Sequence, residues 1–138
     1  MPGHEILEHP ADLGIEAWGA SFSEALSEAV AGLGGILVDP SGVVPREERA
    51  VKIAADDRES LVVRVLSEVL YRFDAEHFVP SGLKTNLESA TAIEGSVVGE
   101  PLDSGRHRLR LDVKAVTYHQ LSVVDSPSEC RIRVFLDI

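Results

Sequence analysis

Apolar and polar residues alternate along the C-terminal segment, and this pattern limits the folds that the chain can adopt. Apolar side chains occupy positions 132, 134, 136 and 138, and arginine or aspartate occupies three of the four positions 131, 133, 135 and 137. The same period of two runs through residues 13–17 and 109–115. A period of two places alternate side chains on opposite faces of a strand. Strands with one apolar face are typical of an antiparallel sheet that is covered on one side.

Two segments with helical periodicity can supply that cover. The first begins at Ser21-Phe22-Ser23-Glu24, whose spacing matches a capping box, and its apolar residues recur at intervals of three and four as far as Leu33. Gly34-Gly35 is expected to stop or loosen this helix. The second helix is predicted over residues 58–73, after an N-cap in the pair Asp56-Asp57.

The other segments are predicted as strands and loops. A loop is expected at residues 39–45, with the charge run 46–49 as its solvated exit. The strands are expected over residues 4–8, 13–18, 51–55, 78–87, 91–98, 106–118, 121–124 and 130–138. The pattern therefore predicts an α+β fold in a single domain, residues 1–138. We expect a two-layer sandwich, with a mostly antiparallel sheet and two long helices packed on one face.

Charge and composition argue against several classes of function. The net charge of −10 opposes strong binding to RNA or DNA, which needs basic residues, and it suits cation binding or docking on a basic protein. The single cysteine, Cys130, excludes an internal disulfide and a cysteine-rich zinc site, and it is expected to be buried in a strand. No apolar run reaches the roughly 18 residues of a membrane span, and the N-terminal residues do not resemble a signal peptide. We therefore expect no membrane association and a cytoplasmic location.

Four groups of polar residues are candidates for a functional site. They are His9 with Asp12, Glu68 with Asp74, the segment 114–119, and Asp137 beside Ile138. The chain has no glycine-rich phosphate loop, no G-x-S-x-G nucleophile motif and no H-E-x-x-H zinc motif. Short catalytic motifs therefore assign no reaction to these groups.

Asp12 and Asp137 are candidate ligands for a hard cation. They lie on segments that could become neighbours in a sheet, and the main chain of Ile138 could add an oxygen. Oxygen ligands from separate strand ends suit calcium or magnesium. Two simpler interpretations remain open. Asp12 could belong to a turn, and Asp137 could be a strand-end residue that faces water.

The remaining candidates each have a structural interpretation beside the functional one. Glu68 lies at the edge of an apolar helical stripe, where a carboxylate can simply reach water. Asp74 lies near the helix end, where its charge opposes the helix dipole. His119 could be a general base, a metal ligand or a strand-end histidine that only forms hydrogen bonds. Lys114 and Tyr118 share one alternating face, which would more often be a solvated surface.

Taken together, these motifs resemble those of the archease family. The resemblance rests on His-x-Ala-Asp-Leu-Gly-Ile followed by Trp-Gly, a Glu-Val-Leu-Tyr helix that runs into Phe-Asp-Ala-Glu, the segment Lys-Ala-Val-Thr-Tyr-His, and the final Phe-Leu-Asp-Ile. Order, spacing and total length agree over nearly the whole chain. The agreement is weaker in residues 81–100 and at Pro10, where the family more often has threonine.

The resemblance implies an accessory protein and not an enzyme. Archeases assist the GTP-dependent RNA ligase that seals tRNA halves, promoting guanylylation of the ligase's active-site histidine and repeated turnover. The resemblance also implies a divalent-metal site, with calcium as the expected ion, on Asp12, Asp137 and the main chain of Ile138. Glu68 and the segment Lys114–His119 match family-typical positions near that site.

Two other functions stay open at this point. A general chaperone or modulator of several proteins, including RNA-modification enzymes, has also been proposed for this family. A small metal-dependent hydrolase with His9 or His119 as its base is the third hypothesis. No nucleophile or substrate pocket for such a hydrolase is recognisable in the sequence.

Overall fold

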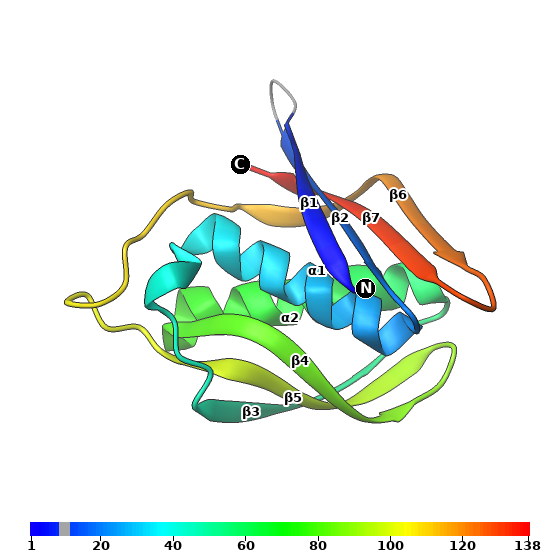
Figure 1. Ribbon diagram of the computed structural model, residues 1–138, viewed down its shortest axis with the longest axis horizontal. Helices are drawn as coiled ribbons and strands as arrows, with labels where there is room; N and C mark the ends of the chain where they lie inside the picture. The colour runs from blue at the N-terminus through cyan, green and yellow to red at the C-terminus, as the bar shows by residue number, and fades with distance from the viewer. Residues whose placement is uncertain (9–11) are drawn as a thin grey trace.

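The computed structural model describes residues 1–8 and 12–138, which form two antiparallel sheets with two long helices between them (Figure 1). The helices are α1 (Phe22–Leu37) and α2 (Arg58–Glu76), and a short 3-10 helix covers Pro40–Gly42. No helix in this described part of the chain is long and apolar enough to cross a lipid bilayer. The strands are β1 (Gly3–Glu8), β2 (Asp12–Gly19), β3 (Glu47–Ala54), β4 (Phe78–Glu88), β5 (Ala92–Pro101), β6 (Ala115–Asp125) and β7 (Cys130–Asp137).

The strands divide between a four-stranded sheet of order β1-β2-β7-β6 and a three-stranded sheet of order β3-β5-β4. Ten of the 16 residues in α1 are buried, because its apolar residues cover more than one narrow stripe. This helix can therefore pack on both β2 and β4, and it lies between the sheets in Figure 1. The predicted α+β class, the antiparallel pairing and the two long helices are confirmed. The structure adds a third layer, because the strands form two sheets instead of one.

Both helices begin at side-chain caps that the sequence indicated. The Ser21 hydroxyl accepts a hydrogen bond from the backbone N–H of Glu24 at 3.2 Å, and the Glu24 carboxylate accepts one from Ala20 N–H at 2.9 Å. At α2 the cap is Asp57, whose carboxylate accepts from Ser60 N–H at 2.7 Å. This hydrogen bond lowers the pKa of the Asp57 carboxyl, so the cap stays ionised as the solution becomes acidic.

Helix α1 continues through Gly34-Gly35 to Leu37, so the glycine pair does not end it. Gly34 faces β4, and a Cβ atom at this position would overlap the carbonyl oxygen of Pro80. The missing side chain lets the helix approach the sheet closely. Gly35 is different, because a Cβ there would meet only Cγ of Pro40, at an ordinary distance of 3.9 Å.

This contrast predicts opposite effects for two neighbouring substitutions. Gly34→Ala is expected to lower the free energy of unfolding by about 1–3 kcal/mol, as overpacking generally does. Gly35→Ala is expected to raise it by up to about 1 kcal/mol, because alanine is the better helix former. Urea unfolding of both variants beside the parent protein measures the two changes. A stabilised Gly34→Ala protein would show that the approach to Pro80 does not restrict this position.

Residues 106–114 were predicted as the first part of a strand, and this prediction is wrong. Apart from one isolated bridge between Val38 and Leu109, the segment lies outside the sheets. Its backbone instead closes the C-terminal end of α1: Arg110 N–H donates to the carbonyl of Leu37 at 2.9 Å, and Leu111 N–H donates to that of Ile36 at 3.1 Å. These carbonyls belong to the last helical turn, which has no partners within the helix. The alternation in this segment therefore does not mark a buried face, and Leu109 is 62% exposed.

Two further boundaries differ from the sequence prediction. The strand segments predicted up to residue 118 and over 121–124 belong to a single irregular strand, β6. The charge run 46–49 was expected to be a solvated loop exit, whereas β3 already begins at Glu47. Charged residues are tolerated there because β3 is at the edge of its sheet.

Cys130 is fully buried at the start of β7, as expected. Burial raises the pKa of its thiol to about 11, which keeps the sulfur protonated and unreactive at neutral pH.

Candidate functional site

The two predicted metal ligands meet at one end of the four-stranded sheet. Asp12 is the first residue of β2 and Asp137 is the last residue of β7, and the antiparallel register places them directly opposite each other. Side chains at directly opposed positions lie about 4.5–5.5 Å apart at Cβ and on the same face. Figure 1 shows the end of β7 beside the start of β2. The sequence prediction that these residues are neighbours in a sheet is therefore confirmed.

The main chain around Asp137 is held by a third strand. Ala115, the first residue of β6, is opposite Asp137, and Lys114 N–H donates a hydrogen bond to the Asp137 carbonyl at 2.8 Å. Ile138 follows directly and is 36% exposed. Three strand ends from distant parts of the sequence therefore converge on the two aspartates.

The chemistry of this group fits a hard divalent cation. All the donors that the sequence nominated are oxygens: two carboxylates and the main chain of Ile138. No cluster of three or more histidine, cysteine, aspartate or glutamate side chains suited to a metal occurs among residues 1–8 and 12–138. The candidate ligand set thus has two side chains from the described residues. His9, the remaining nominee at this end, lies outside the described residues.

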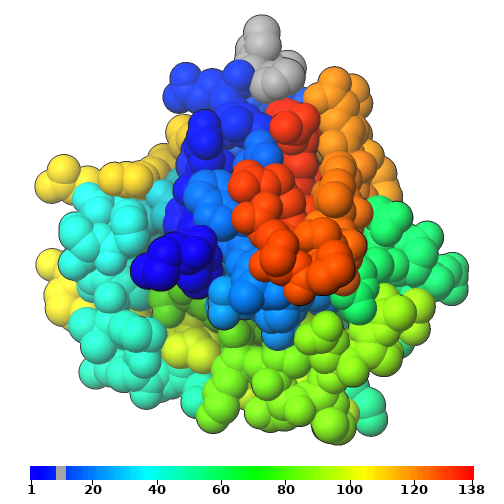
Figure 2. Space-filling view, turned by 45° about the vertical axis from the view of Figure 1, so that its right-hand side comes forward, coloured from blue at the N-terminus to red at the C-terminus, as the bar shows by residue number. Residues whose placement is uncertain are grey.

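Strand alternation separates the aspartates from the core. Leu13, Ile15 and Leu136 belong to the buried core, so Asp12 and Asp137 project from the opposite face of the sheet. We call this the outer face. Figure 2 shows strands of this sheet side by side, with the blue N-terminal residues next to the red and orange C-terminal ones.

The ring of His119 contacts the ring of Phe135, a residue of the outer face. The two rings lie edge to face, with their centroids 6.1 Å apart and an angle of 68° between their planes. Phe135 is 1% exposed although it does not point into the core between the layers. The side chain of His119 itself is exposed. Phe135 is two residues from Asp137 in β7, so this ring contact places His119 toward the aspartate end of the sheet.

A bulge in β6 determines where Tyr118 and His119 lie. Thr117 is opposite Phe135 and Ser122 is opposite Arg133, so β6 uses five steps where β7 uses two. The extra residues leave positions 118–121 without a partner position in β7. Gln120 adopts a left-handed backbone with φ of 51°, which is uncommon for a residue other than glycine. Bulges of this kind often re-aim side chains beside functional sites.

Four other nominated residues lie along α2, on the side of the sheet away from the aspartates. They are Glu68, Asp74, Lys114 and Tyr118. Glu68 and Tyr118 line one hollow of about 550 Å³, and Asp74 and Lys114 line a second of about 300 Å³. The Glu68 carboxylate accepts from Arg72 Nε at 2.8 Å. The position of Glu68 near the metal ligands, which the family resemblance implies, stays a prediction.

A buried carboxylate cluster was not anticipated from the sequence. Glu100 is fully buried at the end of β5, and its carboxylate contacts Arg46 at 3.0 Å, Arg106 at 2.8 and 3.1 Å, and His107 at 2.8 Å. Val44 N–H donates to it at 2.7 Å. The hydrogen bonds and charge of Arg106 hold the pKa of Glu100 far below its ordinary value, despite the opposing effect of burial. Because its partners come from two separate loops, no local sequence motif marked this cluster.

The tautomer of His107 follows from its neighbours. Asp103 N–H donates to Nδ1 at 2.8 Å, so a neutral ring carries its hydrogen on Nε2 and donates it to Glu100. All the polar groups of this cluster are thereby satisfied. Its role is to fasten the two loops to β5, and it offers no free group for chemistry.

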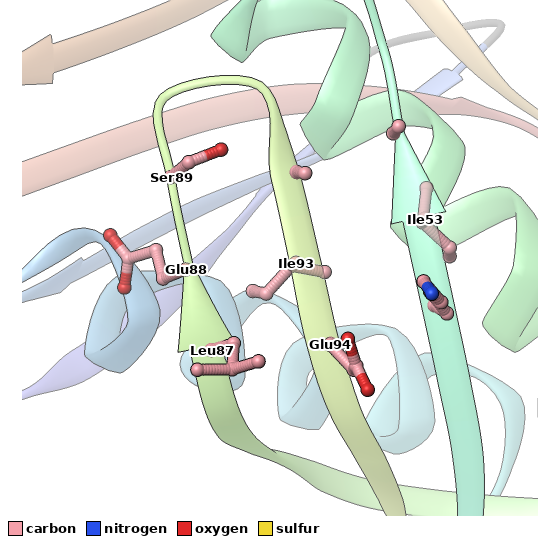
Figure 3. Close-up of a pocket in the computed structure, with 9 residues that line it drawn as sticks. Ile53, Leu87, Glu88, Ser89, Ile93 and Glu94 are labelled. Carbon is pink, nitrogen blue, oxygen red and sulfur yellow. The ribbon is translucent and has the colours of Figure 1, made fainter.

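A separate apolar hollow of about 480 Å³ lies at the turn between β4 and β5, where Leu87, Ile93 and Ile53 are near one another (Figure 3). None of the predicted site residues within the described ranges lines it. Leu87 is 65% exposed there.

Comparison with known proteins identifies the family of the chain. The model of the Archease protein family matches residues 4–138, which include both aspartates and the whole of β6 and β7. The chain belongs to the archease family. The resemblance that the motifs indicated is therefore confirmed over nearly the whole length.

Individual archeases are similar to the chain from end to end. A protein archease of Sulfurisphaera tokodaii is 34% identical over the full length of both chains, and one of Saccharolobus islandicus is 36% identical over 99% of this chain and 98% of its own. The solution structure of protein 1598 of Methanobacterium thermoautotrophicum has a TM-score of 0.83 at 32% identity and covers 99% of both chains. A Thermotoga maritima archease, described as a possible chaperone, shares the fold with a TM-score of 0.60 at 19% identity, over 97% of this chain and 96% of its own.

Proposed function

We propose that this archease is a non-catalytic activator of a GTP-dependent tRNA-splicing RNA ligase. It would promote guanylylation of the ligase's active-site histidine and let the ligase turn over repeatedly. The observation that carries the proposal is the opposition of Asp12 and Asp137 at the sheet end, in a chain that belongs to the archease family. The net charge of −10 supports a protein partner with a basic surface more than direct binding to RNA.

In this proposal, Asp12, Asp137 and the main chain of Ile138 would hold a divalent cation, with calcium the expected ion. The cation would supply positive charge close to nucleotide phosphates. The protein's own contribution would be to hold these oxygen ligands in fixed positions. Three strands fix the sheet end, and the hydrogen bond from Lys114 N–H to the Asp137 carbonyl keeps the last residues of β7 from fraying.

The proposal predicts a specific result in a multiple-turnover ligation assay. Ligase from the same source is incubated with excess RNA halves and GTP, with and without this archease, whose C-terminus is left untagged. More than one sealed product per ligase is expected only when the archease is present. Ligation that is indifferent to the archease at every ratio would contradict the proposal.

The Thermotoga archease's description as a possible chaperone motivates one alternative, a modulator of several proteins. Pull-down from native lysate separates the two hypotheses. A single dominant ligase favours the activator, and a spread of unrelated proteins favours the modulator. Hydrolysis of a nucleotide by the purified archease alone, lost in His119→Ala, would instead favour an enzyme.

A further inference from the structure

One side of the molecule carries an open groove along α2. Both β3 and β6 are edge strands of their sheets, and α2 packs against each of them. The hollow of about 550 Å³ lies between β3, α2 and Tyr118, and that of about 300 Å³ lies between α2 and residues 114–116. Ser67 lines both. We refer to the two hollows together as the α2 groove.

Both tyrosines of the chain line the α2 groove, and each is 59% exposed. Tyr71 comes from α2, and Tyr118 comes from the bulge of β6. Tyrosine is enriched in protein interfaces, because it offers a large apolar ring with a polar end. Two such rings on one groove, supplied by separate elements, indicate a surface for binding another molecule.

The charges of the groove differ from those of the rest of the surface. Counting only pairs between residues 1–8 and 12–138, nine of the 13 lysine and arginine side chains form ion pairs within 4.0 Å. The other four are Lys52, Arg64, Arg108 and Lys114, and all but Arg108 line the groove. Among the described residues, Lys52 forms no ion pair within that distance although Glu94 is opposite it in the sheet, and Arg64 donates to the Ala54 carbonyl at 3.3 Å.

The carboxylates beside these cations do not neutralise them. Glu68 is paired with Arg72 at 2.8 Å, and Asp74 forms no ion pair within 4.0 Å among the residues that the structure describes. In an acidic chain, the groove therefore offers cations that remain available to carboxylates from outside.

We infer that the α2 groove binds an extended acidic segment of a partner protein. Arg64 and Lys114 would pair with its carboxylates, and the two tyrosines would pack on its apolar side chains. From Arg64 to Asp74 the helix rises about 15 Å, enough for four to five residues of an extended peptide. The inference rests on the proposed function only for the identity of the partner, the ligase.

The backbone of β6 favours a polypeptide over RNA as the occupant. Within the described residues, β6 has no neighbouring strand on the side away from β7, so an extended peptide can pair with main-chain groups along that edge. RNA would gain no such pairing.

The test uses a fluorescein-labelled peptide of about eight residues, in which glutamate alternates with leucine, and measures its binding by fluorescence anisotropy at low salt. The wild-type archease is expected to bind it. Tyr71→Ala and Arg64→Glu are each expected to raise the Kd at least about tenfold. Arg108→Glu is the matched control, because it makes the same charge change at an exposed cation outside the groove, and it should alter the Kd less than about twofold. Equal melting temperatures establish that the variants are folded.

Adding the ligase separates this inference from the proposed function. Displacement of the peptide by the ligase supports both. Peptide binding that depends on Tyr71 but is indifferent to the ligase supports the groove and contradicts the ligase as its occupant. No peptide binding by the wild type, or equal binding by all variants, overturns the groove whatever the ligation assay gives. Binding of a labelled single-stranded RNA in place of the peptide, lost in Tyr71→Ala, also overturns it, since the occupant would be nucleic acid.

Discussion

Glu100→Gln is expected to lower the free energy of unfolding by about 3 kcal/mol at pH 7, although the substitution barely changes the shape of the side chain. Removing one member of a buried ion cluster leaves the other charges poorly compensated, which generally costs about 3–5 kcal/mol. We expect the lower end here, because Arg46 and Arg106 are 58% and 39% exposed and can regain water. Glutamine would also place an NH2 donor either at Oε2, which Val44 N–H and His107 Nε2 share, or at Oε1, which Arg46 and Arg106 contact.

The effect of this substitution should depend on pH. The pKa of Glu100 is lowered in the folded protein, first by hydrogen bonds from Arg106, so the folded state holds the carboxylate ionised more strongly than the unfolded chain does. The stability that Glu100 contributes is then fully present above its ordinary pKa of 4.5 and declines as the pH falls below that value. The difference between wild type and Glu100→Gln should therefore shrink between about pH 5 and pH 3.

Urea unfolding of both proteins across this pH range measures the difference directly. Other carboxyls with lowered pKa values that lie away from this cluster, such as those of Asp39 and Asp57, are common to both proteins and cancel in the comparison. Glu94→Gln is the control, because Glu94 is an exposed residue of the same strand. A difference between wild type and Glu100→Gln that stays constant with pH would show that packing, and not charge, is responsible.

Local patterns in the sequence predicted the elements of this fold well. The caps at Ser21 and Asp57 act within one helical turn, and the alternation in β2 and β7 is read from neighbouring residues, so each leaves a mark in a short stretch of sequence. Residues 106–114 show the limit of such patterns. Their alternation matched a strand, but their backbone found partners at the end of α1, which is far away in the sequence.

The division of the strands into two sheets could not be predicted in the same way. A helix with one apolar stripe covers one sheet, and a helix with a wider apolar surface can cover two. The width of that surface in α1 includes Gly32 and Gly34, which pack against Ile15 of β2 and Pro80 of β4 respectively. A glycine in a sequence gives no sign of what it contacts, so the pair Gly34-Gly35 was expected to stop or loosen the helix.

Only those residues of the candidate site that lie at strand ends or in family motifs could be predicted from the sequence. Asp12 and Asp137 are at the termini of strongly patterned strands, so their opposition followed from antiparallel pairing. Glu100 was missed because its partners, Arg46, Arg106 and His107, are brought to it by loops. The α2 groove was missed for a related reason, because its two tyrosines come from different elements. Tyr71 belongs to a helix and Tyr118 to a bulge, and a bulge interrupts the period of two that marks a strand in the sequence.

Asp137→Asn and Asp12→Asn are each expected to abolish ligase activation while leaving the fold intact. Each variant keeps the size of the side chain and removes one of the two opposed carboxylates at the sheet end, which are the side-chain ligands proposed for calcium. Loss of a charged ligand should weaken calcium binding at least about tenfold. Ligation beyond one turnover of the ligase should fall to the level without archease.

Calcium-dependent stability gives a readout that does not involve the ligase. At a calcium concentration of about 100 times the Kd, binding to the folded state alone should raise the free energy of unfolding of the wild type by about 2.7 kcal/mol. The same calcium concentration should have a much smaller effect on either Asn variant. Asp112→Asn, at an exposed position outside the sheets, should respond as the wild type does. If both Asn variants bind calcium and activate the ligase normally, the opposed aspartates are not the metal site, because neither carboxylate would then be needed.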